Sequence, residues 1–132
     1  MTVLVCLDDR NGMQFNGRRQ SRDRVVSAHL LEDSGGGLYV APQSVMLFPP
    51  ETALTVTENV LEDTPEDGVC FVETPPLGPA APRIHRLIVY RWNRIYPADA
   101  VLDLQLDHWT LREQSEFPGN SHPKITREVY EP

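Results

Sequence analysis

Apolar residues occur in short runs along the chain, and the periodicity of each run predicts an element. Residues 2–7 (TVLVCL) are apolar after the first position, which is typical of a strand buried on both faces. Residues 8–17 are rich in Asp, Asn and Gly and predict a loop. Apolar residues then recur at helical spacing from about Ser21 or Arg22 to Asp33, with Ser21 as a suitable N-cap. The glycines at 35–37 predict the end of this helix.

Strands dominate the rest of the chain. Short strands are predicted over residues 38–41, 54–57 and 69–72, and the longest apolar strand over residues 84–92. Residues 109–117 and 124–130 alternate polar and apolar positions, as in a half-solvated antiparallel pair. Eight of the 12 prolines lie between residues 42 and 82. Because proline removes a backbone donor and fixes φ, this region favours rigid loops and short strands over long helices.

Length and charge narrow the class of protein. The 132 residues are enough for one domain with its own core, and we expect a single domain over residues 1–132. The net charge of −7 argues against general nucleic-acid binding and against binding to anionic membranes. No run approaches the roughly 20 apolar residues that a membrane-spanning helix needs. The N-terminus has no signal-peptide pattern, and Cys6 and Cys70 are expected to be free thiols, so we predict a cytoplasmic location.

The most unusual segment holds four arginines within seven residues, in an acidic chain. Arg18, Arg19, Arg22 and Arg24 surround the start of the predicted helix, and guanidinium groups bind phosphates and carboxylates in a bidentate way. One interpretation is a site for an anion or nucleotide; the other is a solvated, salt-bridged loop. Asp23 is the only candidate for a catalytic group, as a proton relay or a partner for a heterocycle. The candidate ligand-binding residues are Asn11, Arg18, Arg19, Gln20, Arg22 and Asp23.

Other reactive residues show no spacing that belongs to a known kind of site. His29, His85, His108 and His122 do not form a metal-binding pattern, so no metal site is expected. No Gly-x-Ser-x-Gly elbow is present, and no pairing of nucleophile and base can be inferred from spacing. Asp8 and Asp9 are adjacent carboxylates that leave a strand, and we interpret them as the start of a loop. His122 is assigned to a turn.

The order of motifs resembles dihydrofolate reductase. A buried first strand is followed by an Asp/Asn-rich loop with a Gly12-Met13 pair, and then by a helix with a carboxylate, Asp23, near its start. A late strand is followed by Asp99, by His108-Trp109 and by an Asn120-Ser121-His122 turn. The resemblance implies one α/β domain with a mostly parallel central sheet, an antiparallel C-terminal hairpin and few, short helices. It also implies a ligand cleft beside residues 11–23, where the family binds its pterin.

The cofactor motifs of that family are missing. A Gly-Gly turn that holds the cofactor pyrophosphate is replaced by Glu73-Thr74-Pro75-Pro76, which adds a negative charge and removes amide donors. A second phosphate-binding turn reads APQS at residues 41–44, without Gly or Arg. We therefore expect no nicotinamide cofactor. The leading hypothesis is a non-catalytic or repurposed protein that binds an anionic small molecule or nucleotide. The alternatives are a reductase of a pterin-like substrate with an atypical cofactor mode, and an interaction module or homodimer.

Overall fold

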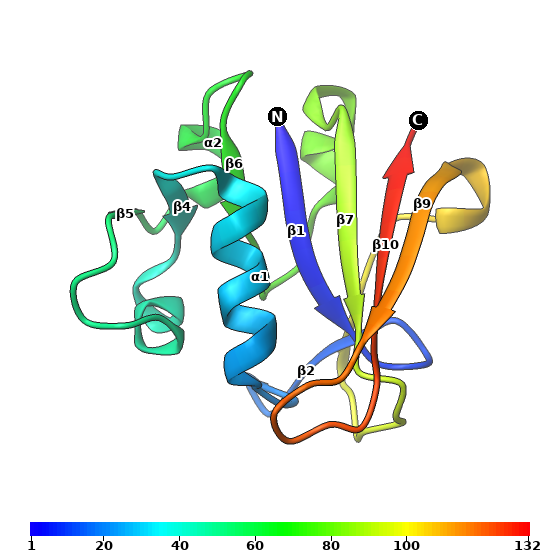
Figure 1. Cartoon of the computed structure of the whole chain (residues 1–132). Helices are drawn as coiled ribbons and strands as arrows, with labels where there is room; N and C mark the ends of the chain where they lie inside the picture. The colour runs from blue at the N-terminus through cyan, green and yellow to red at the C-terminus, as the bar shows by residue number, and fades with distance from the viewer.

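A seven-stranded sheet forms the centre of the protein. The structure is a computed structural model that describes all 132 residues. The sheet order is β5-β4-β6-β1-β7-β10-β9, and Figure 1 shows β5 and β9 at its two edges. The strands from β5 to β7 run parallel, whereas β10 pairs antiparallel with both β7 and β9. The expected α/β class, with a mostly parallel sheet and an antiparallel C-terminal hairpin, is confirmed.

The bounds of the sheet strands lie close to the predicted runs. They are β1 (Thr2–Leu7), β4 (Leu38–Val40), β5 (Leu54–Val56), β6 (Val69–Phe71), β7 (Arg86–Arg91), β9 (Thr110–Phe117) and β10 (Ile125–Glu131). One expectation about the hairpin is wrong. β9 was expected to be half buried, but it is exposed over nearly its whole length, because it is an edge strand with no layer packed over it.

The first strand confirms the interpretation of its apolar run. Side chains alternate across a strand, and Val3, Val5 and Leu7 belong to the core on one face of the sheet. Leu4 belongs to the core on the other face, which the helix α1 covers through Val26 and Leu30. β1 is therefore buried on both faces, at the middle of the sheet (Figure 1).

Helix α1 (Arg24–Ser34) begins later than expected. Its N-cap is Asp23, whose side chain accepts a hydrogen bond from the Val25 amide. The proposed cap, Ser21, lies outside the helix, because the chain is still extended at Asp23, with φ −155°. The predicted glycine stop is confirmed, since Gly35 has φ 62° and its amide bonds to Glu32 O.

A second, small sheet replaces part of the predicted loop at residues 8–17. It consists of β2 (Gly12–Phe15), flanked by β3 (Arg18–Arg19) and β8 (Ala100–Val101). Asp8 fixes the turn that leads into it, accepting from the Gly12 amide at 2.7 Å and the Arg10 amide at 2.8 Å. Burial acts to raise the pKa of Asp8, but the hydrogen bonds it accepts hold that pKa below its ordinary value. Asp8 therefore begins the loop, as expected, and organises it.

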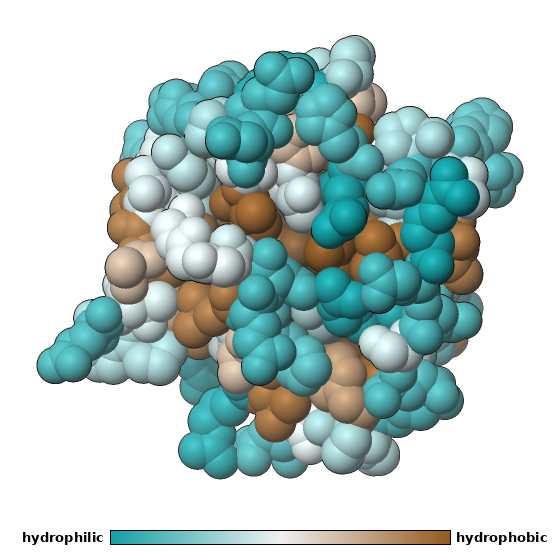
Figure 2. Space-filling model, turned by 45° about the horizontal axis from the view of Figure 1, so that its top comes forward, coloured by the Kyte–Doolittle hydropathy of each residue, from teal (hydrophilic) through white to brown (hydrophobic).

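Short helical turns connect the strands in the proline-rich region and beyond. They are the 3₁₀ helices Pro42–Leu47, Gly78–Arg83 and Leu106–His108, and the one-turn helix α2 (Val60–Asp63). The face in Figure 2 shows apolar residues in separate small areas among polar ones. No helix has both the length and the apolar character needed to cross a bilayer. Cys6 and Cys70 are free thiols, as expected.

Candidate functional site

A narrow pocket opens where the central parallel strands end. Cys6 lies near the end of β1, Phe71 closes β6, and Trp92 directly follows β7. After β1, the chain first adds strands on one side of β1 (β4, β5 and β6) and later adds β7 on its other side. In open α/β sheets, ligands bind at the carboxyl ends of strands where the order reverses in this way. The pocket therefore occupies the position in which this architecture holds ligands.

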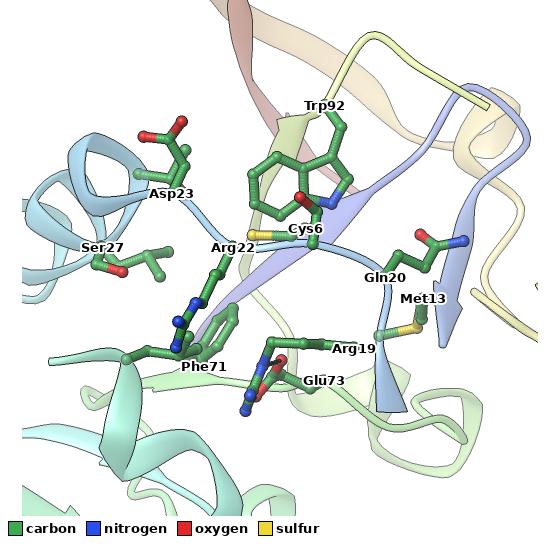
Figure 3. A pocket seen from close by; sticks show the side chains of 14 residues that line it. Cys6, Met13, Arg19, Gln20, Arg22, Asp23, Ser27, Phe71, Glu73 and Trp92 are labelled. Carbon is green, nitrogen blue, oxygen red and sulfur yellow. Dashed lines mark hydrogen bonds and ion pairs between the residues drawn. The ribbon is translucent and has the colours of Figure 1, made fainter. Parts of the chain in front are cut away.

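The pocket has an apolar floor and a polar rim (Figure 3). The enclosed cavity is small, about 20 Å³, and it opens toward wider grooves beside it. Burial raises the pKa of the Cys6 thiol far above its ordinary value, so Cys6 forms part of the apolar wall rather than a thiolate. The other apolar walls are Met13, Val26, Leu30, Leu47, Phe71 and Trp92. The polar rim comes from the segment between β3 and α1, with Ser27 and Glu73.

Arg19 lines the pocket, but its charge is already paired. Its Nε donates to Glu73 Oε2 at 2.8 Å and its Nη2 to Glu73 Oε1 at 2.9 Å. Nη2 also donates to the Gln43 carbonyl at 2.6 Å, and Glu73 accepts from the Ser44 hydroxyl at 2.6 Å. These bonds tie β3 to the end of β6 and to the Pro42–Leu47 turn. Figure 3 shows this pair along one side of the pocket.

Arg22 is the arginine that remains available at the pocket. Its side chain makes no hydrogen bond or ion pair and is exposed, and in Figure 3 it points toward Phe71. Arg22 also borders two wider grooves that adjoin the pocket. Arg18 is also unpaired and lines one of these grooves. Arg24 borders the other groove and donates to Asn120 Oδ1 at 3.0 Å. Arg19 and Arg24 thus make structural contacts, whereas Arg18 and Arg22 have no partner.

Asp23 lies at the pocket wall with its carboxylate turned away from the cavity (Figure 3). The side chain is fully buried. Oδ1 accepts from the Val25 and Asn120 amides, both at 2.9 Å, and Oδ2 accepts from the Ser121 amide at 2.8 Å. Burial acts to raise the pKa of Asp23, but these bonds and the contact with His122 hold it well below its ordinary value. Asp23 is therefore ionised and fixed in place.

His122 completes a buried polar network that the sequence did not reveal. Its Nδ1 lies 2.9 Å from Asp23 Oδ2, and its Nε2 lies 3.1 Å from Ser21 Oγ and 3.2 Å from the Tyr96 hydroxyl. The imidazole stacks on Trp92 with ring centroids 4.7 Å apart, and its side chain is 2% exposed. His122 was assigned only to a turn. It is about a hundred residues from Ser21 and Asp23, so no local spacing could have linked them.

Gln20 lies at the pocket and Asn11 does not. The Gln20 amide nitrogen donates to Asp8 Oδ2 at 3.0 Å and to the Pro97 carbonyl at 3.3 Å. Its Oε1 is buried without a partner. Asn11 accepts from Arg91 Nη1 at 2.5 Å and borders a separate surface groove. Arg19, Gln20, Arg22 and Asp23 thus meet at the pocket and Arg18 at its outer groove, while Arg91 holds Asn11 elsewhere.

The region after β6 provides no cradle for a pyrophosphate. The adjoining groove is lined by Glu58, Glu62 and Glu73 and by no basic residue. The Leu77 and Gly78 amides, at the start of the next helical turn, already donate to the Asp103 carboxylate at 2.7 and 2.8 Å. The side chains that line this groove are therefore acidic or uncharged, and these two amides are already hydrogen-bonded.

Comparison with solved structures decides the fold. Dihydrofolate reductase from Enterococcus faecalis, in a complex with NADP(H) and RAB-propyl, superposes with a TM-score of 0.68 at 11% identity. The match covers 98% of this chain and 94% of that one. The fold is that of dihydrofolate reductase. No family model and no curated protein sequence matches the chain. At this identity the likeness to dihydrofolate reductase establishes architecture alone, because one fold hosts many functions.

Proposed function

We propose that this protein binds an anionic small molecule or nucleotide in the pocket at the carboxyl ends of β1, β6 and β7. The observation that carries the proposal is Arg22, an unpaired guanidinium on the polar rim of a pocket with an apolar floor. In a chain of net charge −7, a cation without a partner at the mouth of a pocket favours an anionic ligand. A guanidinium can hold a phosphate or carboxylate by two parallel hydrogen bonds.

The other walls favour a ligand that also has a flat or apolar part. Phe71 and Trp92 offer aromatic surface, and Leu30 and Val26 offer aliphatic surface. The Gln20 Oε1 is a buried acceptor without a donor, and leaving such a group unpaired costs about 1–3 kcal/mol. A ligand N–H group at this position would remove that cost. A ring with an amino group and an attached phosphate or carboxylate combines these features.

We further propose that binding takes place without a nicotinamide cofactor. The glutamate-lined groove after β6 would repel a pyrophosphate, and the nearby amides are occupied by Asp103. The alternative of a pterin reductase would need another cofactor mode. It remains testable as oxidation of a nicotinamide cofactor in the presence of dihydrofolate.

The interaction-module alternative depends on the edge of the sheet. β9 is an exposed edge strand, but Arg112, Glu113 and Glu116 lie along it, and charged residues on an edge discourage pairing with another chain. We therefore favour the ligand-binding function over homodimerisation, which light scattering would detect. Two free thiols suit a reducing compartment such as the cytoplasm.

A thermal-shift screen of the purified protein tests this function. The panel holds AMP, GMP, inorganic phosphate, pyrophosphate, folate, dihydrofolate, NADPH and NADH. Binding to the native state raises the melting temperature, so we expect stabilisation by at least one anionic ring compound and none by NADPH or NADH. Arg22→Ala should weaken binding by about tenfold or more, the value of one charge-assisted hydrogen bond.

Arg86→Ala is the matched control. Arg86 is exposed, has no partner, and lies at the amino end of β7, away from the pocket. The Arg86→Ala variant loses the same charge as Arg22→Ala but leaves the pocket unchanged. Equal losses of stabilisation in Arg22→Ala and Arg86→Ala, or no stabilisation by any compound, would contradict the proposal. Stabilisation by NADPH together with dihydrofolate would favour the reductase.

A further inference from the structure

Ser21, His122 and Asp23 form a relay of the kind that activates a serine hydroxyl. Asp23 Oδ2 lies 2.9 Å from His122 Nδ1, and His122 Nε2 lies 3.1 Å from Ser21 Oγ. In a serine nucleophile, the base must contact the hydroxyl, and a third group must orient the base. Here the two contacts fall on opposite nitrogens of one imidazole, as that order requires.

The surroundings of the imidazole fix its tautomer. Asp23 accepts amide hydrogen bonds from Val25, Asn120 and Ser121, and its pKa is held low, so an ionised carboxylate faces Nδ1. A carboxylate can only accept, so Nδ1 carries a proton, and in the neutral imidazole Nε2 then presents its lone pair to Ser21. Trp92 stacks on one face of the ring. The Ser21 proton thus has an acceptor in place.

Ser21 also borders the open space of the site. It is half buried, and it lines both the inner pocket and the outer groove that contains Arg18 and Arg22. It also lies two residues before the N-cap of α1, where the helix dipole favours developing negative charge. A bound molecule can therefore reach the hydroxyl while its anionic part lies against an arginine.

We propose that Ser21 is a nucleophile that cleaves carboxylic esters with a negatively charged group. Ser21 Oγ bonds to the acyl carbon while its proton passes to His122 Nε2. The bond from the acyl carbon to the ester oxygen breaks, and the departing alcohol takes that proton. Water then attacks the acyl-serine through the same base, which releases the acid and restores the hydroxyl. The anionic character of the substrate rests on the proposed function, but the reactivity of Ser21 does not.

Tyr96 gives this proposal a second, independent test. Its hydroxyl lies 3.2 Å from the same Nε2, and a neutral imidazole nitrogen has one lone pair to share. The two hydroxyls therefore compete for one acceptor. Tyr96→Phe leaves the lone pair to Ser21 alone and should make Ser21 more reactive. A purely structural network would predict no gain from that change.

The experiment is covalent labelling of the full chain with an alkyl fluorophosphonate, followed by intact mass and peptide mapping. This uncharged reagent needs no arginine, so its result is separate from the ligand screen. We expect one adduct, on Ser21, with loss of fluoride. Ser21→Ala should abolish labelling and His122→Gln should slow it about 100-fold, the contribution of a general base. Tyr96→Phe should speed it, and Ser34→Ala, at the far end of α1, should leave it unchanged.

Three outcomes would overturn the proposal. They are no adduct on the wild type, an adduct on Ser121 instead of Ser21, or unchanged labelling in Ser21→Ala. Ser21→Ala removes only one hydroxyl from a half-buried position, so the variant is expected to remain folded, and circular dichroism of the same sample checks this.

Discussion

The Asp23 carboxylate joins the start of α1 to the turn between β9 and β10, and converting it to an amide should destabilise the protein strongly. Oδ1 accepts two amide hydrogen bonds, and Oδ2 accepts from the Ser121 amide, from the Ser121 hydroxyl and from His122. In Asp23→Asn, one of these oxygens becomes an NH₂ group, which meets donors where it needs acceptors.

The magnitude follows from what each partner can do in response. His122 can change tautomer so that Nδ1 accepts from the new amide. The Ser121 N–H can only donate, so it loses its acceptor, and a buried donor without a partner costs about 1–3 kcal/mol. The remaining hydrogen bonds lose their charge, and each falls from about 1.5–3 toward about 1 kcal/mol. We expect a total loss of about 3–4 kcal/mol, a large share of the roughly 5–15 kcal/mol that stabilises a domain.

Urea unfolding at neutral pH, followed by circular dichroism, measures this loss. The control is Asp9→Asn, because Asp9 is exposed and its side chain makes no hydrogen bond, so its effect should stay within about 0.5 kcal/mol. A difference of less than about 1 kcal/mol between Asp23→Asn and Asp9→Asn would refute the role assigned to this carboxylate.

Three further predictions concern pH, an ion pair and the core. Asp8 and Asp23 have native pKa values below the unfolded value of about 4. Their stabilisation is therefore present above about pH 4 and is lost as pH falls below it, so the unfolding free energy measured from pH 7 to pH 2 should fall most steeply at the acid end. Arg19→Ala leaves the Glu73 side chain, which is 8% exposed, without its cation. The free energy of unfolding in urea should fall by about 2–4 kcal/mol, a value discounted for the partial exposure of Arg19, whereas Arg18→Ala should change it little. Leu30→Ala should lower the unfolding free energy by about 2–5 kcal/mol through a cavity under α1; a loss below 1 kcal/mol would contradict the packing.

The sequence predicted the strands and the end of the first helix because both follow from local pattern. The apolar run at residues 2–7 identified β1 as buried on both faces, and the three glycines identified the end of α1. The arginine cluster lies at the pocket because it adjoins the start of α1, which leaves the sheet beside β1.

Pairings between distant residues could not be predicted from pattern. Nothing in the spacing showed that Arg19 would be neutralised by Glu73 or that His122 would approach Asp23. Asn11 was expected at the pocket because it lies in the right loop, but the backbone turns its side chain toward Arg91. Ser21 was expected as an N-cap, and the register of the helix start gave that role to Asp23. In each case a tertiary contact decided among locally equivalent residues.

The most direct test of the central claim uses the two tryptophans. Trp92 lines the pocket, whereas Trp109 packs in the core on the opposite face of the sheet. In Trp109→Phe, Trp92 is the only tryptophan, and its emission can be followed while AMP, or the best compound of the screen, is added. We predict a saturable change in emission, with an affinity that falls about tenfold or more when Arg22→Ala is added. The change should be absent in Trp92→Phe, in which only Trp109 remains. An unchanged Trp92 emission, or equal affinity with and without Arg22, would contradict ligand binding in this pocket.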